Sequence, residues 1–141
     1  MNLYAESSAV LAWVFRESPA LDIKHLLDQA DVVCASSLTV VECHRALVRS
    51  HALGEVSEHE AGQRRAFLDT AMQAWAVLDL APEILGRARR RFPAEPLRTL
   101  DALHLASALA AKVAMPDLAL LSLDSRVRSS GEALGFDVVP R

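Results

Sequence analysis

The chain has 141 residues, of which 52% are hydrophobic and 23% are charged, a composition typical of one globular domain with a sizeable core. Its net charge of -3 excludes a global basic field that would attract nucleic acid, so any such binding has to be local. No run of about 20 apolar residues occurs, and the first residues lack the basic-then-apolar pattern of a signal peptide. We therefore expect no membrane span and a cytoplasmic location.

Short, largely apolar runs that fit buried strands alternate with longer segments that fit helices. In chain order we expect a strand at 2–4, helices at 8–16 and 21–29, a strand at 31–36, helices at 37–52 and 57–73, a strand at 74–80, helices at 82–92 and 99–112, a strand at 118–123, a helix at 125–134 and a strand at 136–140. This alternation is typical of βαβ units with right-handed crossovers. The sequence predicts a three-layer α/β/α domain with a five-stranded, mostly parallel sheet.

The two cysteines, Cys34 and Cys43, fall in a predicted strand and a predicted helix. This favours reduced, buried thiols over a disulfide. No cysteine or histidine pair has the spacing of a structural zinc site.

Acidic residues stand next to the predicted strands or at helix starts. Glu6 follows the first strand, Glu42 lies early in the helix after the second, and Asp124 follows the fourth. Asp101 stands near the start of the helix over 99–112, which has almost no polar face. A helix that is apolar on all sides is normally buried, and a buried carboxylate has to be paired, hydrogen-bonded, protonated or bound to a metal.

The predicted fold would bring these acids together. Ligands of open parallel sheets bind outside the carboxyl ends of the strands, and helices that follow strands begin at that edge. Carboxylates at close range raise each other's pKa values, and a hard divalent cation relieves their repulsion. The sequence therefore predicts a Mg²⁺ or Mn²⁺ site, which would activate a water and stabilise charge on a phosphodiester.

Each acid also has a purely structural explanation, because acidic residues favour helix N-termini. Asp124 fits a helix N-cap, and Asp101 fits the first turn after a Thr99 cap. The sequence TVVE at 39–42 fits a capping box that would engage Glu42. Asp101 is the acid that this explanation fits least well.

Four segments resemble the motifs of PIN-domain proteins: LYAESSAVLAWV, SSLTVVECHRALVR, LRTLDALHLASAL and LLSLDSRVRSSGEALGFDVV. The third is the most specific match, and together they cover essentially the whole chain as a single PIN-like domain over 1–141. The resemblance implies the PIN fold and a Mg²⁺- or Mn²⁺-dependent endoribonuclease of the VapC type, the toxin of a toxin–antitoxin pair. It also implies an RNA substrate, a cognate antitoxin as partner and a homodimer.

The same motif matches imply which residues form the site. They assign the catalytic metal ligands to Glu6, Glu42, Asp101 and Asp124, with Ser8 and Ser122 as supporting polar groups.

The chain departs from the family pattern at its first acid, where Glu6 replaces the usual aspartate. The extra methylene shifts the carboxylate by roughly a bond length, and metal geometry is sensitive on that scale. A second hypothesis is therefore a catalytically weakened PIN-fold module that binds RNA or an antitoxin.

Arginines cluster in GRARRRF at 86–92, and Arg98 follows after a proline-containing loop. A solvated helix face explains the cluster slightly better than phosphate contacts do. We nevertheless expect Arg98, which is close to Asp101 in sequence, to bind RNA. His104 fits a core histidine bonded to a backbone carbonyl better than it fits a general base.

Apolar residues on the helices at 37–52 and 57–73 belong either to the core or to a dimer face or a groove for a partner helix; they include Leu47, Leu53, Phe67 and Met72. Other α/β classes fit less well, because no G-x-G-x-x-G or Walker A loop is present. A receiver domain would need a catalytic lysine after the fourth strand, and the only lysines are Lys24 and Lys112.

Overall fold

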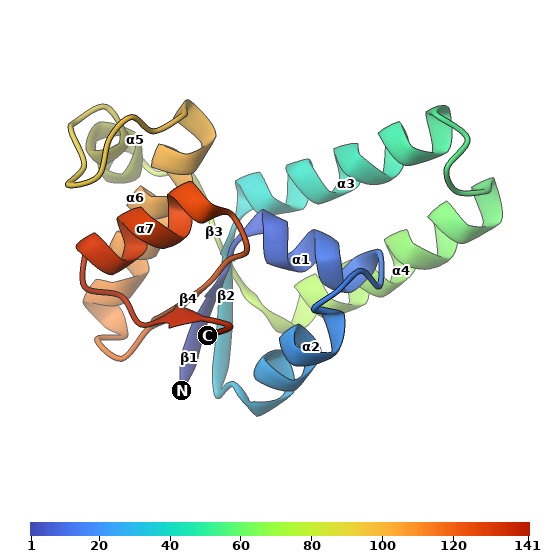
Figure 1. Ribbon diagram of the computed structural model, residues 1–141, viewed down its shortest axis with the longest axis horizontal. Coiled ribbons are helices and arrows are strands. Elements are labelled where there is room, and N and C mark those ends of the chain that lie inside the picture. Colours follow the sequence, from blue (N-terminus) through green and yellow to red (C-terminus); the bar gives the residue numbers. More distant parts are fainter.

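A parallel sheet forms the middle layer of the molecule (Figure 1). The computed structural model describes residues 1–141. The strands are β1 (Asn2–Ala5), β2 (Val32–Ser36), β3 (Ala76–Leu78), β4 (Ala119–Leu121) and β5 (Val138–Val139). They lie in the order β3-β2-β1-β4-β5, and every neighbouring pair is parallel. The predicted five-stranded sheet is confirmed, and it is entirely parallel rather than mostly so.

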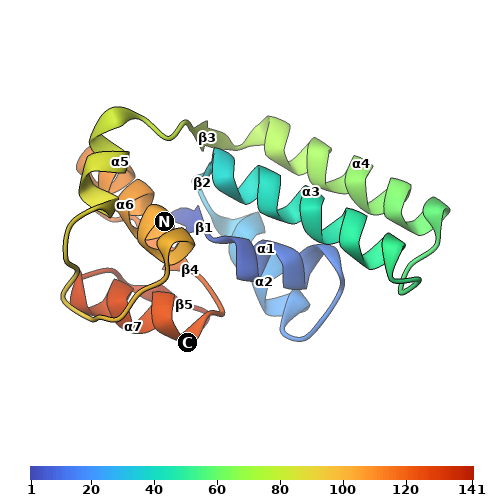
Figure 2. The same cartoon turned by 90° about the horizontal axis from the view of Figure 1, so that it is seen from above.

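Helices cover both faces of this sheet (Figures 1 and 2). They are α1 (Ser7–Val14), α2 (Ala20–Gln29), α3 (Ser37–Ala52), α4 (Glu58–Ala74), α5 (Pro82–Ala88), α6 (Thr99–Ala114) and α7 (Ser125–Ala133). Helices α1 to α4 lie on one side, and α5 to α7 lie on the other. The predicted three layers are confirmed.

Each face of the sheet has its own hydrophobic core. The alternation of side chains along the central strand β1 divides them: Leu3 and Ala5 pack toward α1–α4, and Tyr4 packs toward α5–α7. All three side chains are fully buried. Strands buried on both faces read as continuous apolar runs, which is why the sequence indicated them.

Several elements are shorter than the sequence predicted. The strand expected at 74–80 is limited to Ala76–Leu78, because α4 continues to Ala74. Trp75 stacks on Trp13 of α1 with ring centroids 6.0 Å apart. The first part of this apolar stretch therefore packs against a helix, and only the residues after it join the sheet. The helix expected at 82–92 ends at Ala88 and gives way to a loop that reaches Arg98.

Two of the predicted helix caps are wrong, and the corrections affect the acids. Helix α3 has Ser36 as its N-cap, whose hydroxyl accepts a hydrogen bond from Leu38 N at 3.0 Å, so no capping box forms at 39–42. Helix α6 has Arg98 as its N-cap, and Thr99 is its first residue. Asp101 is therefore the third residue of the helix, where an acidic side chain turns back to the first turn's N–H groups.

The cap predicted at Asp124 is confirmed. Its Oδ1 accepts hydrogen bonds from Arg126 N at 2.9 Å and Val127 N at 3.1 Å. Pro82 opens α5 as expected, and Gly54, at φ 73°, makes the turn between α3 and α4. These two helices form a long hairpin that extends beyond the sheet (Figure 2). None of the helices combines the length and apolar character needed to cross a membrane.

Candidate metal centre

Glu6 stands at the point where β1 ends, and its side chain is only 5% exposed. Its backbone N–H continues the sheet with a 2.9 Å hydrogen bond to Leu121 O of β4. The side-chain Oε2 accepts hydrogen bonds from the hydroxyls of Ser8 and of Ser122, the latter at 2.8 Å. Oε1 accepts none and lies 4.0 Å from His104 Nε2. The buried carboxylate is thus held by one oxygen and leaves the other available.

Glu42 reaches the same edge from α3. Its Oε1 accepts a hydrogen bond from His104 Nε2 at 2.6 Å and another from the Ser7 hydroxyl at 2.7 Å. The other ring nitrogen of His104, Nδ1, lies 3.0 Å from the Tyr4 hydroxyl. Because a carboxylate cannot donate, Nε2 carries a hydrogen and the ring is fixed in orientation.

This network changes the acidity of Glu42. Burial alone would raise the pKa of its carboxyl, but the hydrogen bonds from His104 and Ser7 and the nearby imidazole charge together hold that pKa below its ordinary value. Glu42 is therefore an anion at neutral pH without any metal. Burial also raises the pKa of Tyr4 well above its usual range, so the hydroxyl stays protonated beside the ring.

Asp101 and Asp124 form the outer part of the site. Asp101 is half-buried at the start of α6, one helical turn from His104. Its pKa is raised, first by burial and then by the negative charge of Asp124, and the backbone and side chain of Arg98 offset this only in part. The Asp124 backbone N–H donates to the hydroxyls of Ser8 at 3.2 Å and Ser122 at 3.1 Å, which connects it to the serines that hold Glu6.

The structure therefore brings all four predicted acids to the carboxyl edge of the sheet, but not into one tight cage. No three aspartate, glutamate, histidine or cysteine side chains converge closely enough to enclose an ion by themselves. The donors present are carboxylate oxygens, several of them without a hydrogen bond, as at Glu6 Oε1. This set fits Mg²⁺, which takes one or two carboxylates and keeps several waters.

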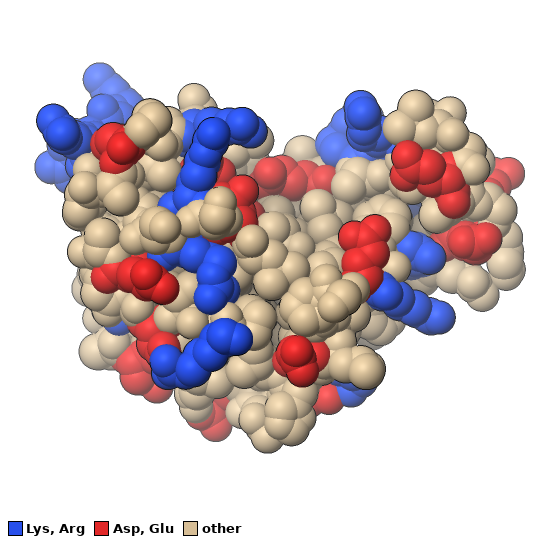
Figure 3. Space-filling view, viewed as in Figure 1, with Lys and Arg blue, Asp and Glu red and all other residues tan.

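Acidic side chains are visible in the hollow between the α5–α7 side and the α3–α4 hairpin, with basic side chains next to them on the α5–α7 side (Figure 3). Arg98 is exposed, and its positive charge is close enough to lower the pKa of Asp101. The predicted neighbourhood of Arg98 and Asp101 is thus present in the structure.

Sequence reasoning missed the residues that hold Glu42. His104 is a core histidine, as expected, but it bonds Glu42 and Tyr4 rather than a backbone carbonyl. The three-residue spacing between Asp101 and His104 was the available signal, because it places both on adjoining faces of one helix. Ser7 and Tyr4 gave no signal, since nothing in the sequence distinguishes Ser7 from Ser8 as a partner for a distant glutamate.

The remaining sequence predictions divide between core and surface. Cys34 and Cys43 are free and buried, and burial raises their thiol pKa values to about 11 and about 12, so both are poorly reactive. Leu47 and Met72 belong to the core, whereas Leu53 and Phe67 are exposed. Phe67 helps line a groove of 850 Å³ between α1, α2 and α4.

Comparison with known proteins bears on the whole chain. A family model described as PIN domain matches residues 3–131. Ribonuclease VapC46 of Mycobacterium tuberculosis (strain ATCC 25618 / H37Rv) is 36% identical over 139 residues, which cover 97% of this chain and 95% of that protein. Ribonuclease VapC35 of the same strain is 30% identical over 141 residues, with 97% and 95% covered. Nucleases of this kind generally depend on divalent metal ions.

Solved structures give the same fold at low identity. Mycobacterium tuberculosis VapC20, described as a sarcin–ricin loop cleaving toxin, matches with a TM-score of 0.69 and 15% identity, covering 99% of both chains. VapBC2 from Rickettsia felis, bound to a DNA fragment from its promoter, matches with a TM-score of 0.64 and 11% identity over 99% of this chain and 98% of that one. On the family match and the 36% identity, the chain belongs to the PIN-domain family as a VapC-like member.

Proposed function

We propose that this chain is a Mg²⁺- or Mn²⁺-dependent endoribonuclease and the toxin of a toxin–antitoxin pair. The observation that carries the proposal is the meeting of Glu6, Glu42, Asp101 and Asp124 at one edge of the sheet, with carboxylate oxygens left free. Two relatives that span nearly the whole chain are named ribonucleases. An RNA substrate follows from that activity.

The four acids would surround a hydrated cation, one or two of them binding it directly and the others through its waters. Ser8 and Ser122 fix the Glu6 carboxylate by its Oε2, and His104 and Ser7 fix that of Glu42 by its Oε1. Hydrogen-bonded partners of this kind set the direction of a ligand and are as important to a metal site as the ligands. Asp101 and Asp124 would supply charge at the open side, where RNA enters.

The bound ion would supply an activated water and would stabilise the negative charge that develops on the phosphodiester. The chain's own contribution is electrostatic. Asp101 and Asp124 repel each other in the metal-free protein, as the raised pKa of Asp101 indicates. Arg98, beside Asp101, would hold a flanking phosphate and so keep the backbone of the RNA within reach of the acids.

The test is single-turnover cleavage of a structured RNA with Mn²⁺ supplied and antitoxin removed. Asp101→Ala is expected to abolish cleavage at every RNA concentration, and Asp117→Ala, an exposed aspartate that follows α6, is the matched control. Metal binding is measured in parallel by calorimetry. Cleavage that survives Asp101→Ala contradicts the assignment of Asp101.

The alternative is a PIN-fold module with a weakened metal site, and the observation that favours it is Glu6 itself. Its longer side chain already uses Oε2 to accept hydrogen bonds from Ser8 and Ser122, which leaves only Oε1 free for a cation. Metal binding by the wild-type protein without cleavage of any RNA tried would select this alternative.

The second part of the proposal is an antitoxin that binds the groove between α1, α2 and α4. Trp13, Leu21 and Phe67 supply its apolar surface, and Leu21 is 83% exposed. Lys24 pairs with Asp28 and Arg64 pairs with Glu60, whereas Arg16 forms no salt bridge and its charge favours an acidic group of the partner. Structural neighbours include a toxin–antitoxin complex from Klebsiella pneumoniae, with a TM-score of 0.63 and 16% identity.

Co-purification with the cognate antitoxin tests the groove. Leu21→Glu is expected to release the antitoxin without unfolding the chain, whereas Val113→Glu, at an equally exposed site on α6, is expected to retain it. Equal retention of the antitoxin by both variants would contradict the proposal that the antitoxin binds this groove. The homodimer stays a prediction, which the molar mass in solution checks against 15.3 kDa for one chain.

A further inference from the structure

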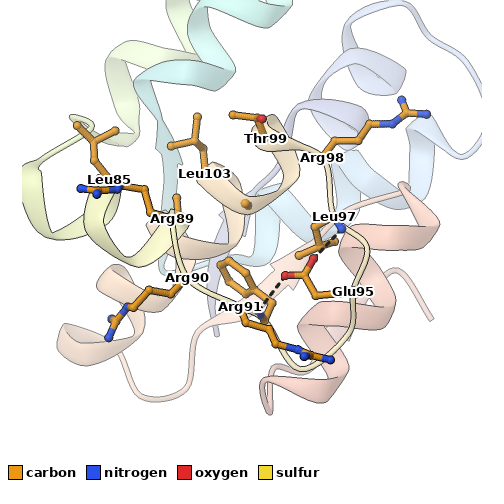
Figure 4. A pocket seen from close by; sticks show the side chains of 12 residues that line it. Leu85, Arg89, Arg90, Arg91, Glu95, Leu97, Arg98, Thr99 and Leu103 are labelled. Carbon is orange, nitrogen blue, oxygen red and sulfur yellow. Dashed lines mark hydrogen bonds between the residues drawn. The ribbon is translucent and has the colours of Figure 1, made fainter.

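A second hollow lies beside the candidate metal centre, at the start of α6. Helix α5, the loop at 89–98 and the first turns of α6 enclose a pocket of about 580 Å³ (Figure 4). Pockets of roughly 300–1,000 Å³ are typical of sites for small molecules. Half of its twelve lining residues are hydrophobic, so it combines an apolar surface with polar groups.

Positive charge is in excess around this pocket, because four arginines and one carboxylate line it. Arg89, Arg90 and Arg91 lie at one end and Arg98 at the other, where it points away from them (Figure 4). All four are exposed, and none forms a salt bridge. Arginines without a carboxylate partner are available to phosphate groups.

The one acidic residue of the lining, Glu95, forms no salt bridge with them. Glu95 accepts hydrogen bonds from the backbone N–H groups of Phe92 at 3.0 Å and Leu97 at 2.7 Å (Figure 4). Its carboxylate therefore links two backbone N–H groups of the same loop. The loop is shaped by its own hydrogen bonds, and the arginines remain free.

The apolar surface of the pocket has a firm support. The Phe92 ring is 1% exposed, and the Arg87 guanidinium covers it at 4.0 Å from the ring centroid. Leu85 on α5, 43% exposed, and Leu103 on α6 face the open space. An apolar surface of leucine side chains bordered by arginines without salt bridges is complementary to a nucleobase with its phosphates.

We propose that this pocket binds one unpaired nucleotide of a single-stranded RNA region, adjacent to the bond hydrolysed at the acidic edge. The proposal rests on the proposed ribonuclease function, because it names the part of the substrate that flanks the cut. The two sites adjoin on one helix: Ala102 lines the pocket, and the preceding residue is Asp101. Bases in an A-form duplex are stacked and cannot enter, whereas those of loops and single strands can turn outward.

The experiment measures binding of labelled octanucleotides by fluorescence anisotropy, with the full chain in EDTA so that nothing is cleaved. The probes are (rA)8, (rU)8, a blunt eight-base-pair RNA duplex and an octamer of abasic tetrahydrofuran phosphate units. At least one homopolymer is expected to bind about tenfold more tightly than the abasic octamer, the effect of burying roughly 55 Å² of apolar surface against the leucines at about 25 cal/mol per Å². The duplex is expected to bind no more tightly than the abasic octamer does.

Variants separate the base contact from the phosphate contacts. Leu85→Ser is expected to remove the tenfold preference for bases, and Leu53→Ser, at the far end of α3 and similarly exposed, is expected to retain it. Arg90→Gln is expected to weaken binding of both octamers and to reduce the salt slope by about one phosphate contact. Arg65→Gln, an exposed arginine of α4 without an ion pair, is the matched control. Ala88→Leu, which fills the pocket, replaces Leu85→Ser if that variant does not fold.

Equal affinity for the abasic octamer and both homopolymers overturns the proposal, as do tight binding of the duplex and failure to bind any octamer at low salt. Equal effects of Arg90→Gln and Arg65→Gln overturn it as well. The ribonuclease function fails separately, when wild-type protein supplied with Mn²⁺ hydrolyses no RNA. Binding in EDTA does not depend on that result.

Discussion

The inner and outer halves of the acidic site are built differently. In the inner half, Glu6 and Glu42 accept hydrogen bonds from serine hydroxyls and from the buried His104. In the outer half, the protein partners of Asp101 and Asp124 are mainly backbone N–H groups at helix starts. The carboxylates of the inner half have side-chain hydrogen-bond donors, whereas the carboxylates of the outer half have none.

Glu42 of the inner half and Asp101 of the outer half have pKa shifts in opposite directions. The pKa of Glu42 is lowered, because hydrogen bonds from His104 and Ser7 outweigh burial, whereas the pKa of Asp101 is raised by burial and by Asp124. A lowered carboxyl pKa means that ionisation stabilises the fold, and a raised one means that ionisation opposes it. Ionised Glu42 therefore stabilises the domain, whereas a cation next to Asp101 would relieve its repulsion by Asp124.

The largest expected effect is at His104, which links the inner acids to the core. His104 itself is 1% exposed, and His104→Leu leaves the hydrogen-bonding groups of Tyr4, Ser7 and Glu42 without this partner. We expect the free energy of unfolding to fall by about 2–4 kcal/mol, because a buried polar group that loses its hydrogen-bond partner costs about 1–3 kcal/mol. Urea denaturation measures this, and Leu109→Ala on the same helix is the control. A loss below about 1 kcal/mol would show that the network does not stabilise the domain.

A smaller effect is expected at Glu6, where shortening the side chain restores the aspartate typical of the family. Glu6→Asp withdraws the carboxylate from the hydroxyls of Ser8 and Ser122, so we expect a loss of about 1–2 kcal/mol of stability in the metal-free protein. We expect metal affinity and cleavage rate to stay equal or to rise. Calorimetry and single-turnover rates measure them, and a tenfold fall in rate, about 1.4 kcal/mol in the barrier, would mean that the site is built around glutamate.

The sequence indicated the layers and the edge of the sheet because both depend on patterns that it displays. Buried parallel strands are apolar along their length, and helices after such strands begin at one edge. These patterns were sufficient to predict that Glu6 and Asp124 lie at the same edge. In the structure Ser122 hydrogen-bonds to both of them, although it is 116 positions from Glu6 in the sequence.

The inner network was not predictable, because it depends on side-chain directions across three elements. Glu42 could have closed a capping box, and only the position of Ser36 as the α3 N-cap excludes this. His104 bonds residues 62 and 100 positions away, at distances that no local pattern specifies. The end of α5 at Ala88 was not predictable either, because the next helix-breaking residue along the chain is Pro93.

Asp101→Asn is expected to raise the free energy of unfolding, whereas His104→Leu is expected to lower it. Because folding raises the pKa of Asp101, the folded state holds the proton more tightly than the unfolded state. Ionised Asp101 therefore costs stability at neutral pH, and this cost disappears as the pH falls below about 4. We expect Asp101→Asn to be more stable than wild type at pH 7, within about 1 kcal/mol, and equal to it at pH 3.5.

Thermal melts of both proteins from pH 3.5 to 7.5, in EDTA, measure this difference. Addition of Mn²⁺ at pH 7 should raise the melting temperature of the wild type and leave that of Asp101→Asn unchanged, since a ligand that binds only the native state stabilises it. A metal-free variant less stable than wild type at pH 7 would place Asp101 with the inner half of the site.

The smallest effect is expected for Arg98, the cation of the outer half. Its side chain is exposed, and its charge is screened, so Arg98→Ala should change stability by less than about 0.5 kcal/mol. Its contribution should appear in RNA binding, as a reduction of the salt slope by about one phosphate contact and a loss of affinity that grows at low salt. Anisotropy titrations of (rU)8 between low and physiological salt measure the slope, with Arg65→Ala on α4 as the control for one lost charge.

Because Arg98 also lowers the pKa of Asp101, the stability gained by Asp101→Asn should be larger when that change is made in the Arg98→Ala variant. Equal salt slopes for Arg98→Ala and Arg65→Ala would show that Arg98 serves the outer acids alone and contacts no phosphate.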